Sequence, residues 1–345
     1  MDSAQVLVTG GTGFIGRHVV KLLLERGNRV RLLVRSPEKA RSLFHDDAEL
    51  VRGDIRDSRS VLRAIRGAES VYHAAGLYAF GLGQKKALYE TNVSGTENVL
   101  RAASETGARR VVHVGSAGVL AAAGRKMNEK DFPAAPRKGC FYKGSKWESE
   151  QTALAWARRG LPVVIASPTC PIGAGDEGPT PTGRIILDFL RRKFPFSTRT
   201  GLNFIDVHDA AAGILAAHDR GAAGERYILG HHNVWLTEFL SLLGSETGLR
   251  APKTELPWWV VALAGASCET GAFLGFPPAR QICWETAVQS GRIQFFDISH
   301  TRAKLGWSPH HSLQESVRRA VAFFEDRLKR PECALESEAT PADVC

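Results

Sequence analysis

Long apolar runs are missing from this 345-residue sequence. No stretch of about 18 residues, the usual minimum for a membrane-spanning helix, is apolar and free of charge. The nearest candidate, Pro257 to Phe276, contains Glu269. The N-terminus also lacks the basic and apolar regions of a secretory signal peptide. We therefore expect a cytoplasmic protein.

Paired cysteines are the second absence. The six cysteines lie far apart, and no C-x-x-C pair occurs. Neither the cysteines nor the eleven histidines show the spacing of a metal site. We expect free thiols in a reducing compartment and no metal.

Continuous basic runs are the third absence, although Lys and Arg number 45 against 36 Asp and Glu. The basic residues come as scattered pairs, such as Arg109 and Arg110, without interleaved aromatic residues. This pattern argues against a nucleic-acid partner and leaves an anionic small molecule or an anionic membrane surface as partners. The last fifteen residues hold four acids and no base, and we expect this acidic tail, 331–345, to be disordered.

Short β-branched runs alternate with helical-period stretches through the first 170 residues. This alternation predicts an α/β fold, a Rossmann-type doubly wound parallel sheet with strands buried on both faces. The expected strands are Gln5–Thr9, Val30–Val34, Glu49–Arg52, Ser70–His73, Arg110–Val114 and Pro162–Ala166, with helices such as Gly16–Arg26 and Ala87–Thr106 between them. Beyond Pro168 a Gly/Pro-rich loop leads into a smaller, mainly helical C-terminal lobe. Its expected helices are Arg184–Arg192, His208–Asp219, Thr237–Thr247, Trp258–Leu274 and Ser312–Lys329, and its extended pieces are Asn203–Ile205 and Arg226–Leu229.

A glycine string separates the first expected strand from its helix. Gly11, Gly13 and Gly16 fit G-x-G-x-x-G, while Gly10, Gly13 and Gly16 fit G-x-x-G-x-x-G. Between a strand and a helix, this string predicts a turn that binds the pyrophosphate of a dinucleotide at the helix N-terminus. The residues expected there are Gly10, Thr12, Gly13, Phe14, Ile15 and Gly16.

The residues after the second and third strands indicate which dinucleotide binds. Arg35 ends the second strand and Lys39 follows it, where an NAD site would place an acid. Bases there favour NADP(H) over NAD(H), because they can meet the 2′-phosphate. Asp54, followed by Ile55, either reaches the adenine or caps the next helix. We accordingly expect residues 1–170, with a return at about 203–230, to form the NADP-binding domain, and 171–330 to form the substrate-binding lobe.

Tyr142 and Lys146 stand four residues apart, on one face of an expected helix. Ser116 follows the fifth strand, at the sheet edge where doubly wound folds place their ligands. A cationic Lys146, together with the positive charge of an oxidised nicotinamide, would lower the pKa of the Tyr142 phenol. Ser116 would hydrogen-bond a substrate oxygen. We expect these three residues to be catalytic.

These residues, with His73-Ala74-Ala75-Gly76 and Asn92, resemble the extended short-chain dehydrogenases/reductases over residues 4 to 327. Within them the chain is similar to the dihydroflavonol-reductase-like branch and to bacterial hopanoid-associated sugar epimerases. The resemblance implies that Tyr142 is the general acid/base, that Lys146 orients the ribose and that Ser116 binds the carbonyl. It implies further cofactor contacts at Ala74, Ala75, Gly76, Pro168 and Thr169, and a structural or proton-relay role for Asn92. At Gly115 the sequence departs from the family, which commonly has a second serine or threonine there.

The same catalytic set serves reductases and epimerases. Leu202 and Asn203 stand where nucleotide-sugar enzymes place a cation, although Arg199 lies nearby. The aromatic segment from Trp258 to Trp284 is either a pocket wall or a surface that meets lipid at the inner membrane face. We therefore expect an oxidoreductase for a hydrophobic small molecule, with an epimerase and a non-catalytic NADP-binding protein as alternatives. The resemblance suggests a monomer or homodimer.

Overall fold

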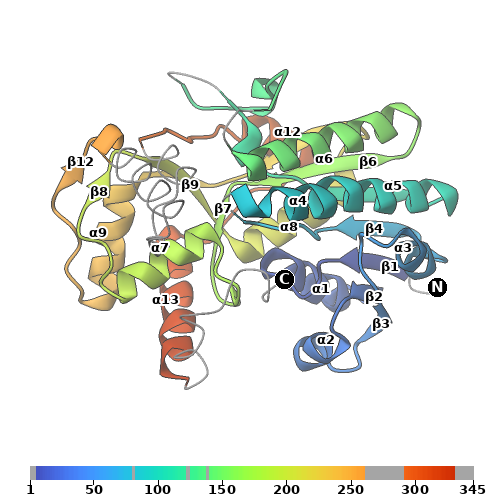
Figure 1. Cartoon of the computed structure of the whole chain (residues 1–345), viewed down its shortest axis with the longest axis horizontal. Helices are drawn as coiled ribbons and strands as arrows, with labels where there is room; N and C mark the ends of the chain where they lie inside the picture. The colour runs from blue at the N-terminus through green and yellow to red at the C-terminus, as the bar shows by residue number, and fades with distance from the viewer. Residues whose placement is uncertain (1–4, 80–81, 122–124, 137–139, 261–290, 331–345) are drawn as a thin grey trace.

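The apolar runs form a parallel sheet, as the sequence predicts. The structure, a computed structural model, describes residues 5–79, 82–121, 125–136, 140–260 and 291–330 (Figure 1). The main sheet has the order β10-β6-β5-β4-β1-β2-β3, and every neighbouring pair in it is parallel. Its strands are β1 (Gln5–Thr9), β2 (Arg29–Val34), β3 (Ala48–Arg52), β4 (Ser70–His73), β5 (Arg110–Val114), β6 (Val163–Pro168) and β10 (Arg226–Leu229). The doubly wound fold is therefore confirmed.

Helices cover both faces of this sheet. Val6 and Val8 pack into one core with α1 (Phe14–Glu25), α2 (Pro37–Phe44) and α8 (Val207–Arg220). Leu7 points the other way, into a core formed with α3 (Ser58–Ile65), α5 (Gly95–Glu105) and α6 (Phe141–Arg158). Side chains alternate along a strand, so each strand feeds both cores. The apolar character of the runs follows from burial on both faces.

The order of the strands reverses between β1 and β4, and such a switch point forms the ligand crevice of doubly wound sheets. The Ala74 N–H donates to the Thr9 carbonyl at 3.1 Å, which joins the chain after β4 to the end of β1. The glycine string therefore lies beside Ala74, at the carboxyl edge of the sheet.

The expected helix Ala87–Thr106 is present but not uniform. It consists of α4 (Lys85–Tyr89), a π-helical turn (Glu90–Ser94) and α5, and the short 3₁₀ turn Leu82–Gln84 precedes it. Buried Asn92 lies in the π turn. Such turns occur frequently at functional sites.

A second lobe packs beside the sheet. Strands β7 (Cys170–Ile172), β9 (Gly201–Asp206) and β11 (His232–Trp235) form a three-stranded sheet, and β8 (Ser197–Thr198) pairs with β12 (Glu255–Leu256). Helices α7 (Pro181–Leu190), α9 (Leu236–Thr247) and α13 (Leu313–Lys329) share a core in which Phe204 stacks on Phe239 at 4.1 Å. Figure 1 shows these helices at the opposite end of the molecule from β3, and α12 (Ser299–Leu305) beside the sheet.

Several sequence predictions concern parts of the chain that the structure leaves out. Most of the helix Trp258–Leu274, the end of the aromatic segment at Trp284 and the tail 331–345 lie outside the described residues. Cys140 and Cys170, which are described, are free thiols. Among the described helices, none combines the length and apolar character needed to cross a bilayer.

Candidate active site

The glycine string forms the turn that the sequence predicts. Gly10 has φ +72°, and a Cβ on it would lie 2.5 Å from the Ala75 nitrogen. A Cβ on Gly16 would overlap the Gly10 carbonyl. Gly13 donates to that same carbonyl at 3.0 Å and precedes α1, whose start has no side-chain cap and no acid in its first turn. A helix start of this kind suits a phosphate, so the turn fits a dinucleotide.

The other predicted phosphate-side residues surround this turn. Phe14 and Ile15 open α1, and the Thr12 carbonyl accepts a hydrogen bond from Arg17 at 3.2 Å. The Ala75 N–H donates to the Thr9 hydroxyl at 3.4 Å. Gly76 is exposed, and a Cβ on it would lie 3.3 Å from Asn92 Oδ1 and 3.9 Å from Lys146 Nζ. The structure thus brings residues 74–76 between the glycine turn and Lys146.

Arg35 and Lys39 lie where the 2′-phosphate is expected. Arg35 is exposed immediately after β2. Lys39, on α2, lies with its Nζ 3.4 Å from Glu177 Oε2, and Glu177 Oε1 lies 2.9 Å from Arg17 Nη1. The Gly/Pro-rich loop is therefore joined to α1 and α2 by one carboxylate.

Asp54 does not cap the following helix. Asp57 is the N-cap of α3, and its carboxylate accepts from the Arg59 N–H at 3.0 Å. Asp54 accepts hydrogen bonds from Arg56 instead, the shortest at 2.7 Å. Partial burial raises the pKa of Asp54, but these hydrogen bonds and the Arg56 charge bring it below its ordinary value. Ile55 packs into the core, and Asp54 lines an open cavity of about 490 Å³ with Arg56, Asp57, Glu90 and Ser94.

Ser116 and Tyr142 meet at the end of β5. Ser116 caps the 3₁₀ turn Ala117–Val119, and its Oγ accepts from the Gly118 N–H at 3.2 Å. Tyr142 lies in the first turn of α6, 9% exposed, with the ring of Tyr78 3.9 Å away. Burial raises the pKa of Tyr142, and a hydrogen bond with the Ser116 side chain only partly opposes this. Without a cofactor the phenol is therefore neutral, and the predicted lowering of its pKa includes the charge of an oxidised nicotinamide.

Lys146 lies one helical turn further along α6. Its Nζ donates to the Val114 carbonyl at 2.8 Å, and only 7% of the residue is exposed. Burial lowers the pKa of Lys146 to about 8, and the nearby charge of Glu150 opposes this effect. Lys146 thus keeps most of its charge near pH 7 while lying in a buried site.

Asn92 connects the switch-point loop to α6. Its Oδ1 accepts from the Leu77 N–H at 2.7 Å, and its Nδ2 donates to the Leu77 carbonyl at 3.0 Å and to Ser145 Oγ at 2.9 Å. Ser145 immediately precedes Lys146, so Asn92 fixes both the loop and the helix that carries the lysine. These contacts favour the structural interpretation of Asn92.

Pro168 and Thr169 lie at the same sheet edge. Pro168 ends β6, and the Thr169 N–H donates to the Leu229 carbonyl at 3.0 Å. Because β5 and β6 are parallel neighbours, their carboxyl ends lie at the same edge of the sheet. Pro168 therefore lies at the edge where Ser116 follows β5.

The sequence argument missed a buried polar group beneath this site. Glu150 is fully buried and paired with Arg226, while its Oε2 and Ser167 Oγ have no hydrogen-bond partner in the described structure. A Cβ on Gly115 would lie 2.8 Å from Ser167 Oγ and 3.4 Å from Glu150 Oε2. Glycine at 115 therefore makes room for Ser167. The i, i+4 spacing of Lys146 and Glu150 is the sequence signal that could have found this group.

An apolar cavity adjoins Ser116. It has a volume of about 220 Å³, and its lining includes Gly118, whose N–H donates to Ser116 Oγ. Its lining is apolar apart from Lys143 and consists of Gly118, Val119, Leu120, Ala121, Pro133, Ala135, Pro136, Lys143 and Trp147.

Comparisons with known proteins identify the family of this chain. The model of the NAD dependent epimerase/dehydratase family matches residues 6–230. A putative dihydroflavonol 4-reductase of Synechocystis sp. is 37% identical over 326 residues, which are 92% of this chain and 94% of that protein. Sterol demethylase protein B of Methylococcus capsulatus is 31% identical over 325 residues, 93% of this chain and 98% of that protein.

A solved structure supports the same relationship. The crystal structure of gox2253 superposes with a TM-score of 0.79 at 32% identity, covering 94% of this chain and 99% of that one. These similarities extend over nearly the whole chain. The chain therefore belongs to the NAD-dependent epimerase/dehydratase family, within the dihydroflavonol-reductase-like branch of the extended short-chain dehydrogenases/reductases.

Proposed function

We propose that this enzyme is an NADP(H)-dependent oxidoreductase that interconverts a ketone and a secondary alcohol on a hydrophobic substrate. The observation that carries the proposal is the hydrogen-bonded pair of Ser116 and Tyr142 beside an apolar cavity of about 220 Å³. The substrate would be an isoprenoid-, sterol- or flavanonol-like molecule, and the lobe 171–330 would hold it.

The catalytic roles follow from the positions of the side chains. NADPH, when bound, supplies the hydride that reaches the carbonyl carbon. Tyr142, neutral because it is buried, donates its Oη proton to the carbonyl oxygen. Ser116 Oγ donates a hydrogen bond to the same oxygen as negative charge develops on it. Lys146, anchored to the Val114 carbonyl one helical turn after Tyr142, would orient the ribose of the cofactor.

The cofactor would extend along the carboxyl edge of the sheet. Its pyrophosphate would lie on the turn from Gly10 to Gly16, and its 2′-phosphate near Arg35 and Lys39. Asp54 and Ile55 would border the adenine, since Asp54 lines the open cavity after β3. The nicotinamide end would lie between residues 74–76, Pro168 and Thr169, close to Tyr142 and Lys146.

The second lobe supports a hydrophobic substrate over a nucleotide sugar. Asn203 is fully buried, with Nδ2 donating to Asn233 at 2.8 Å and Oδ1 accepting from the His231 N–H at 3.0 Å. The guanidinium of Arg199 lies 5.4 Å from the Trp235 ring centre. A diphosphate held against apolar walls without matched cations would lose several kcal/mol to desolvation. One relative is named a sterol demethylase protein, which accords with this class.

Two alternatives remain. The first is a hopanoid-associated sugar epimerase, which would keep NAD(P) bound and return the hydride to the other face of its keto intermediate. The name of the matching family, NAD dependent epimerase/dehydratase, supports this alternative. The second is a non-catalytic NADP-binding protein, whose function would not require the hydrogen bond between Ser116 and Tyr142. We propose a cytoplasmic location with peripheral contact at the membrane. The membrane contact is proposed because Trp258 and Trp259 are 55% and 54% exposed.

A substrate panel tests the proposal. NADPH oxidation is followed with flavanonols, steroid ketones, isoprenoid ketones and nucleotide sugars, and we expect turnover with one apolar class. Tyr142→Phe should slow that turnover at least about a hundredfold, whereas Tyr72→Phe, in the core, should not. Epimerisation of a nucleotide sugar without net NADPH oxidation would establish the first alternative and contradict the proposal.

A further inference from the structure

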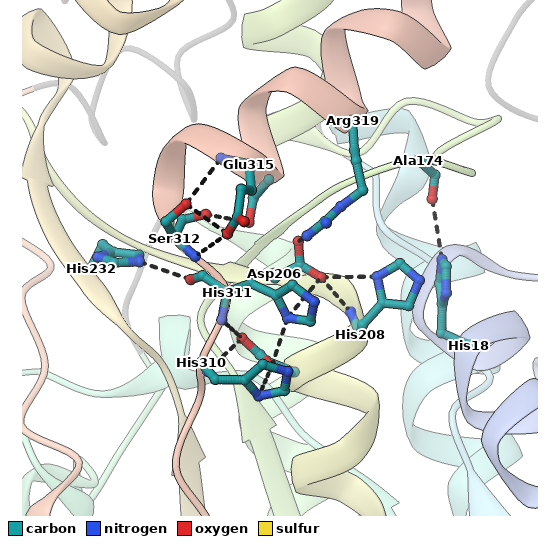
Figure 2. Close-up of polar contacts among 12 residues, drawn as sticks. His18, Ala174, Asp206, His208, His232, His310, His311, Ser312, Glu315 and Arg319 are labelled. Atoms are coloured by element: carbon teal, nitrogen blue, oxygen red, sulfur yellow. Dashed lines mark hydrogen bonds and ion pairs between the residues drawn. The ribbon is translucent and has the colours of Figure 1, made fainter.

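A cluster of histidines and aspartates lies where α8 meets the segment between α12 and α13 (Figure 2). Asp209, in the first turn of α8, is fully buried. Its Oδ2 accepts the backbone N–H groups of His310 and His311 at 3.1 and 3.0 Å. These two hydrogen bonds fix the backbone of residues 310–311 against α8.

The same backbone geometry directs both imidazoles toward the other carboxylate oxygen. Nδ1 of His310 lies 3.0 Å from Asp209 Oδ1, and Nδ1 of His311 lies 2.9 Å from it. Each of the three residues offers one ligand atom that lies within 4.8 Å of the other two. In the part of the chain that the structure describes, they are the one group of three such ligand atoms.

We propose that Asp209 Oδ1, His310 Nδ1 and His311 Nδ1 bind one divalent transition metal ion, with Zn²⁺ as the representative. Two imidazoles and one carboxylate are a donor set that suits Zn²⁺, Ni²⁺ or Cu²⁺ rather than Mg²⁺ or Ca²⁺. Tetrahedral Zn²⁺ with bonds of about 2.0–2.1 Å needs donors about 3.3 Å apart, so small side-chain shifts suffice.

The surroundings leave one side of the site open. The His310 side chain is 74% exposed and that of His311 23%, so solvent water can complete the coordination. On the buried side, the His311 carbonyl contacts His232 Nε2 at 3.2 Å, which helps hold the backbone. Outer partners of this kind orient ligands and support affinity.

The neighbouring cluster members serve other contacts. Asp206 pairs with His208 and Arg319 and lies 4.0 Å from His311 Nδ1. His208 meets the ring of His18 edge-on, and His18 reaches the Ala174 carbonyl at 3.1 Å (Figure 2). His208, whose side chain pairs with Asp206, therefore acts as a matched control. Asp209 and the two histidines lie about 100 residues apart in sequence, which is why spacing alone predicts no metal site.

The experiment uses the full chain after chelation and dialysis, titrated with Zn²⁺ alone in a calorimeter. We expect one Zn²⁺ per chain and a raised melting temperature. His310→Gln with His311→Gln should weaken binding at least about a hundredfold, because loss of an outer partner alone costs about 10–100-fold. His208→Gln and the exposed His300→Gln should bind as the wild type does.

Three outcomes overturn the site: no Zn²⁺ binding by the wild type, equal binding by the double variant, or loss of binding in His208→Gln with binding kept in the double variant. Because the double variant leaves Asp209 and its hydrogen bonds to the backbone in place, its circular dichroism should match the wild type. Equal displacement by Mg²⁺ would contradict the assignment to a transition metal.

Discussion

At the residue scale, Lys146 depends on a partner that the catalytic set does not include. Glu150 lies one turn after Lys146 and supplies the negative charge that opposes the loss of the lysine's proton. Burial raises the pKa of Glu150 itself, while Arg226 and then Lys146 lower it. We therefore expect Glu150 to act through Lys146, as a positioning residue.

Glu150→Gln should move the basic limb of the rate profile. Without the carboxylate, the pKa of Lys146 should fall below its present value of about 8. Lys146 would then lose its proton at a lower pH than in the wild type, and the rate should drop at that lower pH. KM for the substrate should change little. Glu148→Gln, on the same helix, is the control. An unmoved basic limb would show that Glu150 has only a packing role.

At the element scale, the Gly/Pro-rich loop before α7 contacts a residue of the proposed cofactor site. Glu177 draws Lys39 toward the loop while also pairing with the buried Arg17. If Lys39 binds the 2′-phosphate, the carboxylate weakens that binding by its charge.

Glu177→Gln should therefore bind NADPH about two- to fivefold tighter, the range expected for one exposed charge pair, with NADH affinity unchanged. Calorimetric titration of this variant with each cofactor checks the prediction.

Arg35→Asp should weaken NADPH binding at least about tenfold. Calorimetric titration with both cofactors measures each effect. Equal NADPH and NADH affinities in the wild type would refute the assignment of the 2′-phosphate site, and an Arg35→Asp variant that keeps its preference would do the same.

Sequence patterns predicted the strands because residues buried on both faces read as apolar runs. They placed the end of β6 two residues early, at Ala166, since Ser167 and Pro168 are strand residues only through pairing with Ile228 and Leu229 of β10. The ion pair of Glu150 with Arg226 joins residues 76 positions apart and leaves no local signal. The π turn at Asn92 likewise follows from its contacts with Leu77 and Ser145.

At the scale of the whole molecule, Trp258 and Trp259 are exposed large apolar side chains. We expect the full chain to bind phosphatidylcholine vesicles that contain phosphatidylglycerol, because interfacial Trp residues bury apolar area at the headgroup level. Trp258→Ser with Trp259→Ser should weaken binding at least about tenfold. Leu328→Ser, 37% exposed on α13, is the control. Sedimentation with vesicles decides, and a wild type left in the supernatant would contradict the expectation.

The late arrival of β10 has a consequence during synthesis. It is the partner of β6, yet Leu229 follows Pro168 by 61 residues, which ribosomes take about 3–12 s to add. For that time β6, which pairs with β5 on one side, has an unpaired edge on the side where β10 will lie. An exposed apolar strand edge is prone to aggregation. Leu305 and Trp307 later complete the core over α8. The seven-stranded sheet is therefore completed only once residues 226–229 have been made, well after its other six strands.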